Sequence, residues 1–185
     1  MIRVMILLVV VSSMLGASSA PPVGVGASSP KASERSMKKA VKIEMVKDGE
    51  TLEAKFRLLK ELGFDGVELP SPNSWTVDEV VAASKATGLP VHGVVCSEHW
   101  TSPLNHDDPA VRAKCVEAIR EAIQDAKAYG ATSVLVVPAV VRKGMPYDEA
   151  WKRSREEILK VVPDAEAAGI NILFENVWNN FLLSP

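Results

Sequence analysis

The chain has 185 residues, of which 47% are hydrophobic and 24% are charged, and its formal net charge is −2. This length and composition are those of a globular protein with room for one domain and a hydrophobic core. The nearly balanced charge excludes a strongly basic surface for nucleic acid, and it gives no basis for binding an anionic membrane.

The first 20 residues have the layout of a secretory signal peptide. One early cation, Arg3, precedes an apolar stretch at 4–11, and small residues then lead to Ala20. The apolar stretch is too short to span a bilayer comfortably, so we expect cleavage and no stable membrane insertion. We therefore predict export to the periplasm or the cell exterior, with an uncleaved apolar anchor as the alternative.

Residues 21–37 are rich in Pro, Gly, Ser and Ala and show no hydrophobic period. Such a composition is typical of a flexible linker. We therefore expect the folded domain to occupy residues 38–185.

The predicted domain contains two cysteines, Cys96 at a predicted strand end and Cys115 in a helical apolar stripe. These positions favour separate buried thiols over a disulfide.

Short β-like runs alternate with helical patterns from residue 39 onward. The apolar runs predict five strands, at 39–45, 64–70, 89–97, 132–140 and 170–176. The 3.6-residue patterns between them predict four helices, at 51–63, 77–88, 109–130 and 147–168. Each predicted helix ends at or next to a glycine, which accepts the positive φ of a helix C-cap.

Local signals mark several helix ends. Thr76 with Glu79 three residues later forms a capping box. Asp108 followed by Pro109 is the pattern of a helix N-cap and first helical position. Pro163 lies inside the fourth predicted helix, and we expect it to kink or split that helix, because proline cannot donate the backbone hydrogen bond that the helix interior needs.

Five strands alternating with four helices imply right-handed crossovers and a parallel sheet, either doubly wound or a β/α barrel. The segment 44–51, after the first strand, has one glycine among acidic residues, an environment that would repel a dinucleotide's pyrophosphate. Polar residues instead gather at strand ends, where a barrel builds its site: Glu68, His99 and Glu175. We therefore predict an α/β fold of barrel type, incomplete because five strands cannot close a ring of eight.

Four stretches carry a resemblance to a known family: LLKELGFDGVELPSP, VHGVVCSEHW, DDPAVRAKCVEAIREAIQDAKAYGATSVLVVPAVV and FENVWNNFLLSP. Together they resemble the sugar phosphate isomerase/epimerase family, the xylose isomerase-like TIM barrel group, over residues 39–185. The group includes ketose 3-epimerases, hydroxypyruvate isomerase and, more distantly, endonuclease IV. The resemblance implies a partial (β/α)8 TIM barrel, represented here by its N-terminal five strands.

The same resemblance implies a divalent metal: Mn²⁺, Mg²⁺ or Co²⁺, with Zn²⁺ as an alternative. In the family, a Glu at the end of the fifth strand shares the ion with an Asp, a His and a second Glu from three later strands. Glu175 matches the first of these ligands, and the other three positions have no counterpart in this sequence. We therefore expect a truncated chain that holds the metal weakly or lacks it.

Glu175 is accordingly the candidate catalytic and metal-binding residue, although its spacing alone also suits a salt bridge or a helix cap. Asn176 and Trp178 are candidates for the substrate pocket, through an amide hydrogen bond and an apolar wall, with loop packing as the alternative. Glu68 and His99 are further candidates for substrate contact. Their alternatives are a structural ion pair and a hydrogen-bonded structural histidine.

Arg142 and Lys143 follow the fourth predicted strand and suit a phosphate or carboxylate, although a solvated charge pair is the simpler interpretation. The implied activity is isomerisation or epimerisation of a ketose, a ketose phosphate or a small keto acid, by metal-assisted proton transfer through an enediolate.

Two alternatives stay open for the function. One is a catalytically inactive fragment or binding module, and pairing with a second copy to cover the sheet edges is also open. The other is an endonuclease-IV-like metal hydrolase. Such an enzyme would need more histidine ligands and a basic face for DNA, whereas this chain has only three histidines and a negative net charge.

Overall fold

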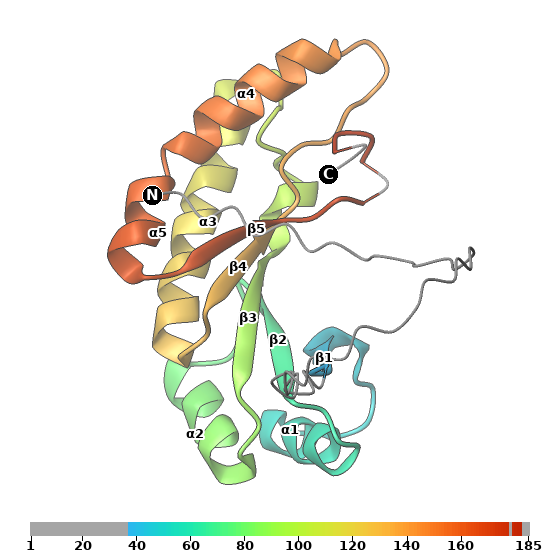
Figure 1. Ribbon diagram of the computed structural model, residues 1–185, viewed down its shortest axis with the longest axis vertical. Coiled ribbons are helices and arrows are strands. Elements are labelled where there is room, and N and C mark those ends of the chain that lie inside the picture. The colour runs from blue at the N-terminus through green and yellow to red at the C-terminus, as the bar shows by residue number, and fades with distance from the viewer. Residues whose placement is uncertain (1–36, 178, 183–185) are drawn as a thin grey trace, which may run out of the picture. The chain divides into compact units, whose positions relative to one another are not determined.

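The computed structural model describes residues 37–177 and 179–182, and a compact unit begins at Lys38. Its centre is a parallel sheet whose strands follow the chain order β1-β2-β3-β4-β5 (Figure 1). The strands are β1 (Ala40–Lys42), β2 (Gly66–Ser71), β3 (Val91–Cys96), β4 (Ser133–Val136) and β5 (Asn171–Phe174). A doubly wound sheet reverses its strand order at a switch point, and this sheet does not, so the prediction of a partial barrel is confirmed.

Helices separate the strands along the described part of the chain. They are α1 (Leu52–Glu61), α2 (Val77–Thr87), α3 (Pro109–Tyr129), α4 (Tyr147–Leu159) and α5 (Val162–Ala168), with 3₁₀ turns η1 (Ile43–Met45) and η2 (Ser97–Trp100). The fourth predicted helix is thus split into α4 and α5. Pro163 lies in the first turn of α5, where its missing N–H has no intrahelical role, as expected.

The predicted helix caps are confirmed. Thr76 Oγ1 accepts a hydrogen bond from the Glu79 backbone N–H at 3.2 Å, and the Glu79 carboxylate accepts one from the Thr76 N–H at 2.7 Å. Asp108 Oδ1 accepts from the Ala110 N–H at 2.8 Å at the start of α3. Gly130 ends α3 with φ of 75°, a left-handed conformation that glycine adopts without steric cost.

All five strands are shorter than predicted, the first and the fourth by the most residues. The first ends at Lys42, and Glu44 lies in η1. The fourth ends at Val136, although the apolar sequence continues to Val140. At Val140 the side-chain amide of Asn105 replaces a neighbouring strand: Asn105 Oδ1 accepts from Val140 N–H at 3.0 Å, and Asn105 Nδ2 donates to Val140 O at 2.8 Å. An apolar run cannot reveal such a distant side-chain partner.

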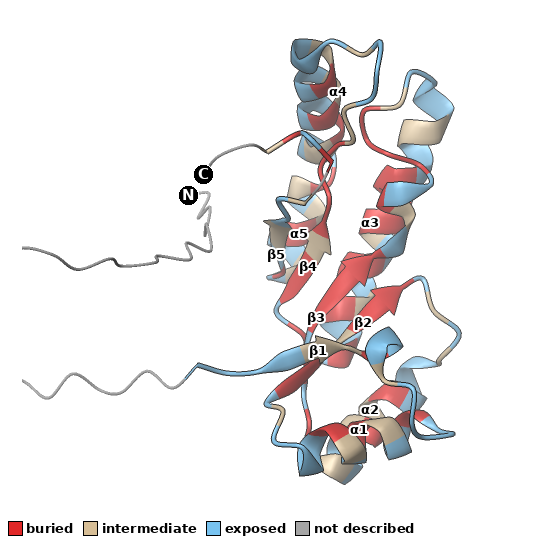
Figure 2. Cartoon of the chain, turned by 90° about the vertical axis from the view of Figure 1, so that its right-hand side faces the viewer, coloured by how far each residue is buried: buried red, intermediate tan, exposed pale blue. Residues whose placement is uncertain are grey.

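The hydrophobic core lies between one face of the sheet and the helices, and buried residues follow this layer in Figure 2. Helix α3 contacts β2, β3 and β4. Residues with no exposed surface line the layer from both sides, among them Phe56, Val67, Leu69, Val94, Ile123 and Val134. On the other face of the sheet, Glu68 is half-buried and Asn171 is exposed, so the two faces differ in polarity.

Cys96 and Cys115 are both free and fully buried between β3 and α3. The prediction of separate buried thiols rather than a disulfide is confirmed, and the two thiols interact through a hydrogen bond. That bond lowers the pKa of Cys96, and together with burial it raises the pKa of Cys115 far above its usual range.

The outer edges of β1 and β5 have no partner strand among the residues that the structure describes. Phe174, the last residue of β5, is 42% exposed. No helix within the described ranges is both long and apolar enough to cross a membrane. The predicted signal peptide and linker at 1–36 lie outside those ranges, so export stays a prediction.

Candidate functional site at the carboxyl ends of the strands

Glu68 lies in the middle of β2, not at its end as predicted, because the strand pairing continues to Ser71, and it belongs to a polar row that crosses the sheet. Its register partners are Lys42 on β1 and Gly93 on β3, and in the same row Ser133 on β4 pairs with Asn171 on β5. A Cβ atom at Gly93 would lie 3.5 Å from Glu68 Oε1 and 3.1 Å from Ser133 Oγ. The carboxylate and the hydroxyl therefore converge over Gly93, where the absence of a side chain leaves them room.

Three effects set the protonation of Glu68, and together they raise its pKa. Burial is the largest, because the charged carboxylate loses hydration. The positive charge of Lys42 opposes it, and the negative charge of Glu175 adds to it. Lys42 is itself paired with Glu44 Oε2 at 3.0 Å. Glu68 thus holds its proton more tightly than a solvated glutamate does.

His99 lies in η2, directly after β3, and only 2% of its surface is exposed. Its Nδ1 accepts a hydrogen bond from the Val137 backbone N–H at 3.3 Å, and its ring meets Trp100 edge-on with centroids 5.1 Å apart. Burial, and then the charge of Lys42, lower the pKa of His99 to about 4. The imidazole is therefore neutral near pH 7, and with Nδ1 accepting, Nε2 carries the ring proton and is a donor.

Glu175 directly follows β5 and is exposed. Its backbone N–H donates to Val136 O at 3.2 Å, which continues the β4–β5 pairing by one residue and fixes where the side chain leaves the sheet. After burial and the charge of Lys42, its negative charge is the third influence on the pKa of Glu68 and raises it. The carboxylate therefore lies within electrostatic reach of Glu68, which is earlier along its own strand.

The segment after Glu175 is anchored to the loop between β4 and α4, which it meets in Figure 1. Val141 N–H donates to Asn179 O at 2.9 Å, and Asn179 Nδ2 donates to Ala139 O at 2.6 Å. Phe181 is buried, its ring stacks on Trp151 with centroids 5.5 Å apart, and its carbonyl accepts from Tyr147 Oη at 2.7 Å. These contacts anchor the residues that follow Glu175, at Asn179 and Phe181, to the loop and to helix α4.

The structure places two of the five candidate residues, His99 and Glu175, directly after the carboxyl ends of β3 and β5. Glu68 lies earlier along β2 and is linked to Glu175 by electrostatics, and the charge of Lys42 acts on both Glu68 and His99. Asn176 is exposed in the anchored segment, and Trp178 lies outside the described residues. The polar row also contains Lys42 and Ser133, which the sequence analysis did not single out. The only sequence signal for them was a polar residue inside a short apolar run, which many surface strands also show.

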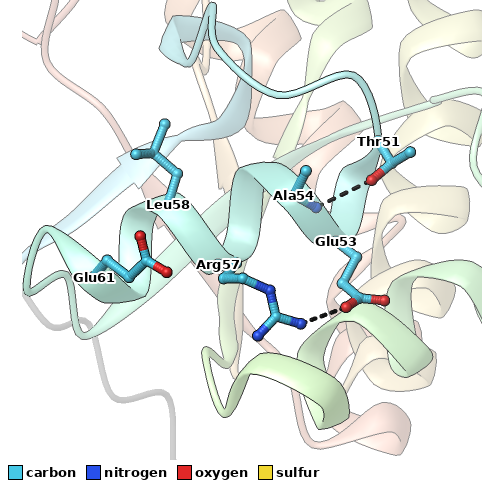
Figure 3. A pocket seen from close by; sticks show the side chains of 6 residues that line it. All are labelled: Thr51, Glu53, Ala54, Arg57, Leu58 and Glu61. Carbon is cyan, nitrogen blue, oxygen red and sulfur yellow. Dashed lines mark hydrogen bonds and ion pairs between the residues drawn. The ribbon is translucent and has the colours of Figure 1, made fainter.

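A hollow of 360 Å³ along α1 does not belong to this site (Figure 3). Thr51 and residues of that single helix line it, and three of its polar side chains are already engaged. Thr51 Oγ1 accepts from Ala54 N–H at 3.1 Å, and Arg57 pairs with Glu53 at 2.5 Å. No groups from separate elements converge there, so the hollow has no chemical focus.

The described residues contain no group of three or more His, Cys, Asp or Glu side chains placed to hold a metal ion. The positive charge of Lys42 also acts to lower the pKa of Glu68 and of His99. A cation this close to two of the candidate ligands disfavours the binding of a positively charged metal ion. The donor set that the structure describes is therefore not by itself a complete divalent-metal centre.

Comparisons with known proteins show the family and the fold of the chain. Residues 56–184 match the family described as xylose isomerase-like TIM barrel. L-ribulose-5-phosphate 3-epimerase UlaE of Salmonella paratyphi B is 30% identical over 138 residues, which cover 69% of this chain and 49% of that protein. The chain thus spans about half the length of the curated relatives that it matches.

Two solved structures share the fold. The first, 3-keto-D-glucoside 4-epimerase YcjR from E. coli, has a TM-score of 0.66 and 21% identity, covering 78% of this chain and 57% of YcjR. The second, the IolI protein with a zinc atom, has a TM-score of 0.61 and 16% identity, covering 74% of this chain and 50% of IolI. The chain belongs to the xylose isomerase-like TIM barrel family.

Proposed function

We propose that this chain carries part of the active site of a sugar epimerase or isomerase that acts on a ketose or ketose phosphate. A relative at 30% identity is an L-ribulose-5-phosphate 3-epimerase, and a protein of the same fold is a sugar 4-epimerase. The proposed reaction removes a proton from the carbon next to the substrate carbonyl. The resulting enediolate is then reprotonated, on the opposite face for an epimerase or on the neighbouring carbon for an isomerase.

Glu175 is the proposed base. Its carboxylate is exposed at the end of β5, where a substrate can reach it, and its main chain is fixed by the bond to Val136. On the other side of Glu175, the contacts of Asn179 and Phe181 anchor the chain and limit its movement. A base held in one position removes the entropic cost of bringing it to the substrate, which is a large part of an enzyme's effect on rate.

Glu68 and His99 are the proposed partners of Glu175. Glu68 keeps its proton to a higher pH than a solvated carboxyl, and its proposed role is to hold a substrate hydroxyl by a hydrogen bond while Glu175 accepts a proton. Neutral His99 offers Nε2–H, which suits an oxygen that gains negative charge as the enediolate forms. Two carboxyl groups in different surroundings thus take opposite roles.

A divalent ion, when bound, would stabilise the enediolate's two oxygens. Glu175 is the ligand that this chain offers, and the described residues do not complete the set. The roles of Glu175, Glu68 and His99 given above depend only on those side chains. The observation that supports the proposal is the position of Glu175, which is exposed directly after β5 with its N–H bonded to Val136 O, at the carboxyl end of a strand, where barrel enzymes have their sites.

Hydrogen–deuterium exchange at the substrate carbon tests the proposal. The full chain, with and without added Mn²⁺, is incubated in D₂O with ribulose 5-phosphate or a free ketose, and loss of the proton signal is followed by NMR. We expect exchange, and a Glu175→Gln variant should be slower by roughly 100-fold or more. The matched control, Glu166→Gln, changes an exposed carboxylate on α5 and should exchange at the original rate.

Each result bears on a different alternative. Sugar binding without exchange in the unmodified chain would favour a binding module over a catalyst. Equal exchange rates for the Glu175→Gln and Glu166→Gln variants would refute the role given to Glu175.

A further inference from the structure

A second feature at the same end of the sheet is a cavity of about 410 Å³ between two loops. The loop from β3 to α3 contributes Asn105 and Asp107 to its wall. The loop from β4 to α4 contributes Arg142, Lys143 and Met145. Both loops follow the carboxyl ends of their strands, so the cavity lies on the side of the sheet where Glu175 lies.

The acidic residues in the cavity wall are already paired. Arg153 binds Asp107 Oδ1 through Nη1 at 2.5 Å and Glu149 Oε1 through Nε at 2.7 Å. Arg142 and Lys143 are exposed and make no ion pair with any described residue. Of the five charged groups in the wall, the two that remain unpaired are thus both cationic. An anion in the cavity would therefore be attracted by two unpaired cations, while the two carboxylates of the wall are neutralised by Arg153.

The loop that carries the two cations is held in place. The Asn105 side chain bonds both backbone groups of Val140 and also contacts Met145 Sδ at 3.0 Å. Met145 N–H donates to Arg142 O at 3.1 Å across a turn in which Gly144 has φ of 89°. The cations therefore extend from a fixed turn, which reduces the conformational entropy lost when a ligand binds.

Helix α4 begins at the cavity and adds to its positive character. Pro146 and Glu149 line the wall, and no side chain caps the first turn of the helix. Backbone N–H groups at a helix N-terminus carry partial positive charge, which supplements the two side-chain cations.

We propose that this cavity binds the phosphate group of a phosphorylated sugar, with Arg142 and Lys143 as its ligands. The guanidinium group can bind two phosphate oxygens at once, and the ammonium group supplies a compact positive charge. Adjacent Arg and Lys side chains therefore suit a doubly charged phosphate better than they suit a singly charged carboxylate ligand. The cavity also has a structural link to the proposed base, because Val141 N–H binds Asn179 O in the segment that follows Glu175. The assignment to a sugar substrate rests on the proposed function, whereas the anion site does not.

Titration of the full chain with inorganic phosphate tests the anion site independently of catalysis. Binding is followed by backbone amide shifts in NMR, at fixed ionic strength maintained with chloride. We expect saturable shifts in the cavity loops, and an Arg142→Ala/Lys143→Ala double variant should bind at least tenfold more weakly. The control Lys152→Ala/Arg155→Ala removes the same charge from exposed positions of α4 outside the cavity and should bind as the unmodified chain does.

Three results would overturn the proposal: no saturable binding by the unmodified chain, equal weakening in both double variants, or shifts that map away from the two loops. Equal weakening would mean that only net charge matters. A second titration compares ribulose 5-phosphate with ribulose, and the cavity predicts tighter binding of the phosphate, lost in the Arg142→Ala/Lys143→Ala variant. If neither sugar exchanges deuterium, the proposed function fails while the phosphate titration still decides the anion site.

Discussion

Glu175 raises the pKa of Glu68 across the sheet, although β3 and β4 separate their strands. The effect requires that the two carboxyl groups lie within electrostatic reach of each other, although Glu68 is within its strand and Glu175 follows the end of its own. It also separates their roles, because burial already favours the protonated form of Glu68 while Glu175 is exposed. A pair of carboxyl groups in unlike surroundings can act as proton acceptor and proton donor at one pH.

The raised pKa of Glu68 predicts a pH-dependent cost to stability. The folded state holds this proton more tightly than the unfolded state, whose pKa is near 4.5, so stability falls as pH rises from 4.5 through the folded-state pKa. A Glu68→Gln variant, which cannot ionise, should be more stable than the unmodified chain at pH 7 and closer to it at pH 4. Urea denaturation at both pH values measures this, with the exposed Glu61→Gln variant as control. A Glu68→Gln variant less stable at pH 7 than at pH 4, relative to the unmodified chain, would contradict the assignment.

His99 predicts the opposite dependence at lower pH. Its folded-state pKa is about 4, below the usual 6.5, so the unfolded state takes up the proton first and stability is lost as pH falls from 6.5 through 4. The full difference corresponds to about 3 kcal/mol. A His99→Gln variant should lose much of this dependence, and its free energy of unfolding between pH 7 and pH 4 can be compared with that of the unmodified chain. Parallel pH curves for the two proteins would show that His99 is not buried as a neutral ring.

Gly93 predicts a steric effect on the polar row. An alanine Cβ there would lie 3.1 Å from Ser133 Oγ, closer than nearly all such contacts, and 3.5 Å from Glu68 Oε1. We expect Gly93→Ala to destabilise the protein by about 1–3 kcal/mol. Adding Ser133→Ala removes the nearest atom and should restore part of the loss, as a double-mutant cycle of denaturation curves would measure. Strict additivity of the two substitutions would mean that the hydroxyl does not face Gly93.

The packing of Phe181 should determine how firmly the segment after Glu175 is anchored. The ring is buried against Trp151 and Tyr147, so Phe181→Ala should cost about 3 kcal/mol and increase amide exchange at 176–182. Phe174→Ala, at an exposed position of the neighbouring strand, should cost less than about 1 kcal/mol. If both variants lose equal stability, or exchange at 176–182 stays slow in Phe181→Ala, the aromatic contacts do not anchor the segment.

Much of the fold could be predicted because its signals are local. The capping box at Thr76, the glycine at 130 and the proline at 163 each act within a few residues, and they placed the helix boundaries. The alternation of strands and helices then led to a parallel sheet. The end of β4 could not be predicted, because the side chains that bond its continuation, His99 at Val137 and Asn105 at Val140, are distant in sequence.

The site was only partly predictable for a similar reason. Glu68 and Glu175 stand out as acids beside apolar runs, and His99 follows another such run. Lys42 enters the site only through the register of β1 against β2, and the convergence of Glu68 and Ser133 depends on a register shift at Val67 and Glu68. Register is a property of two strands together, so one strand's sequence does not contain it.

The most direct test of the account is the pKa of Glu68, measured by ¹³C NMR titration of its carboxyl carbon in the unmodified chain and in Glu175→Gln. The account predicts an elevated pKa in the unmodified chain and a lower one in the variant, because the substitution removes a neighbouring negative charge. The exposed Glu166→Gln substitution on α5 should leave the titration unchanged. A Glu68 pKa that is the same with and without the Glu175 charge would show that the two carboxyl groups do not share a site.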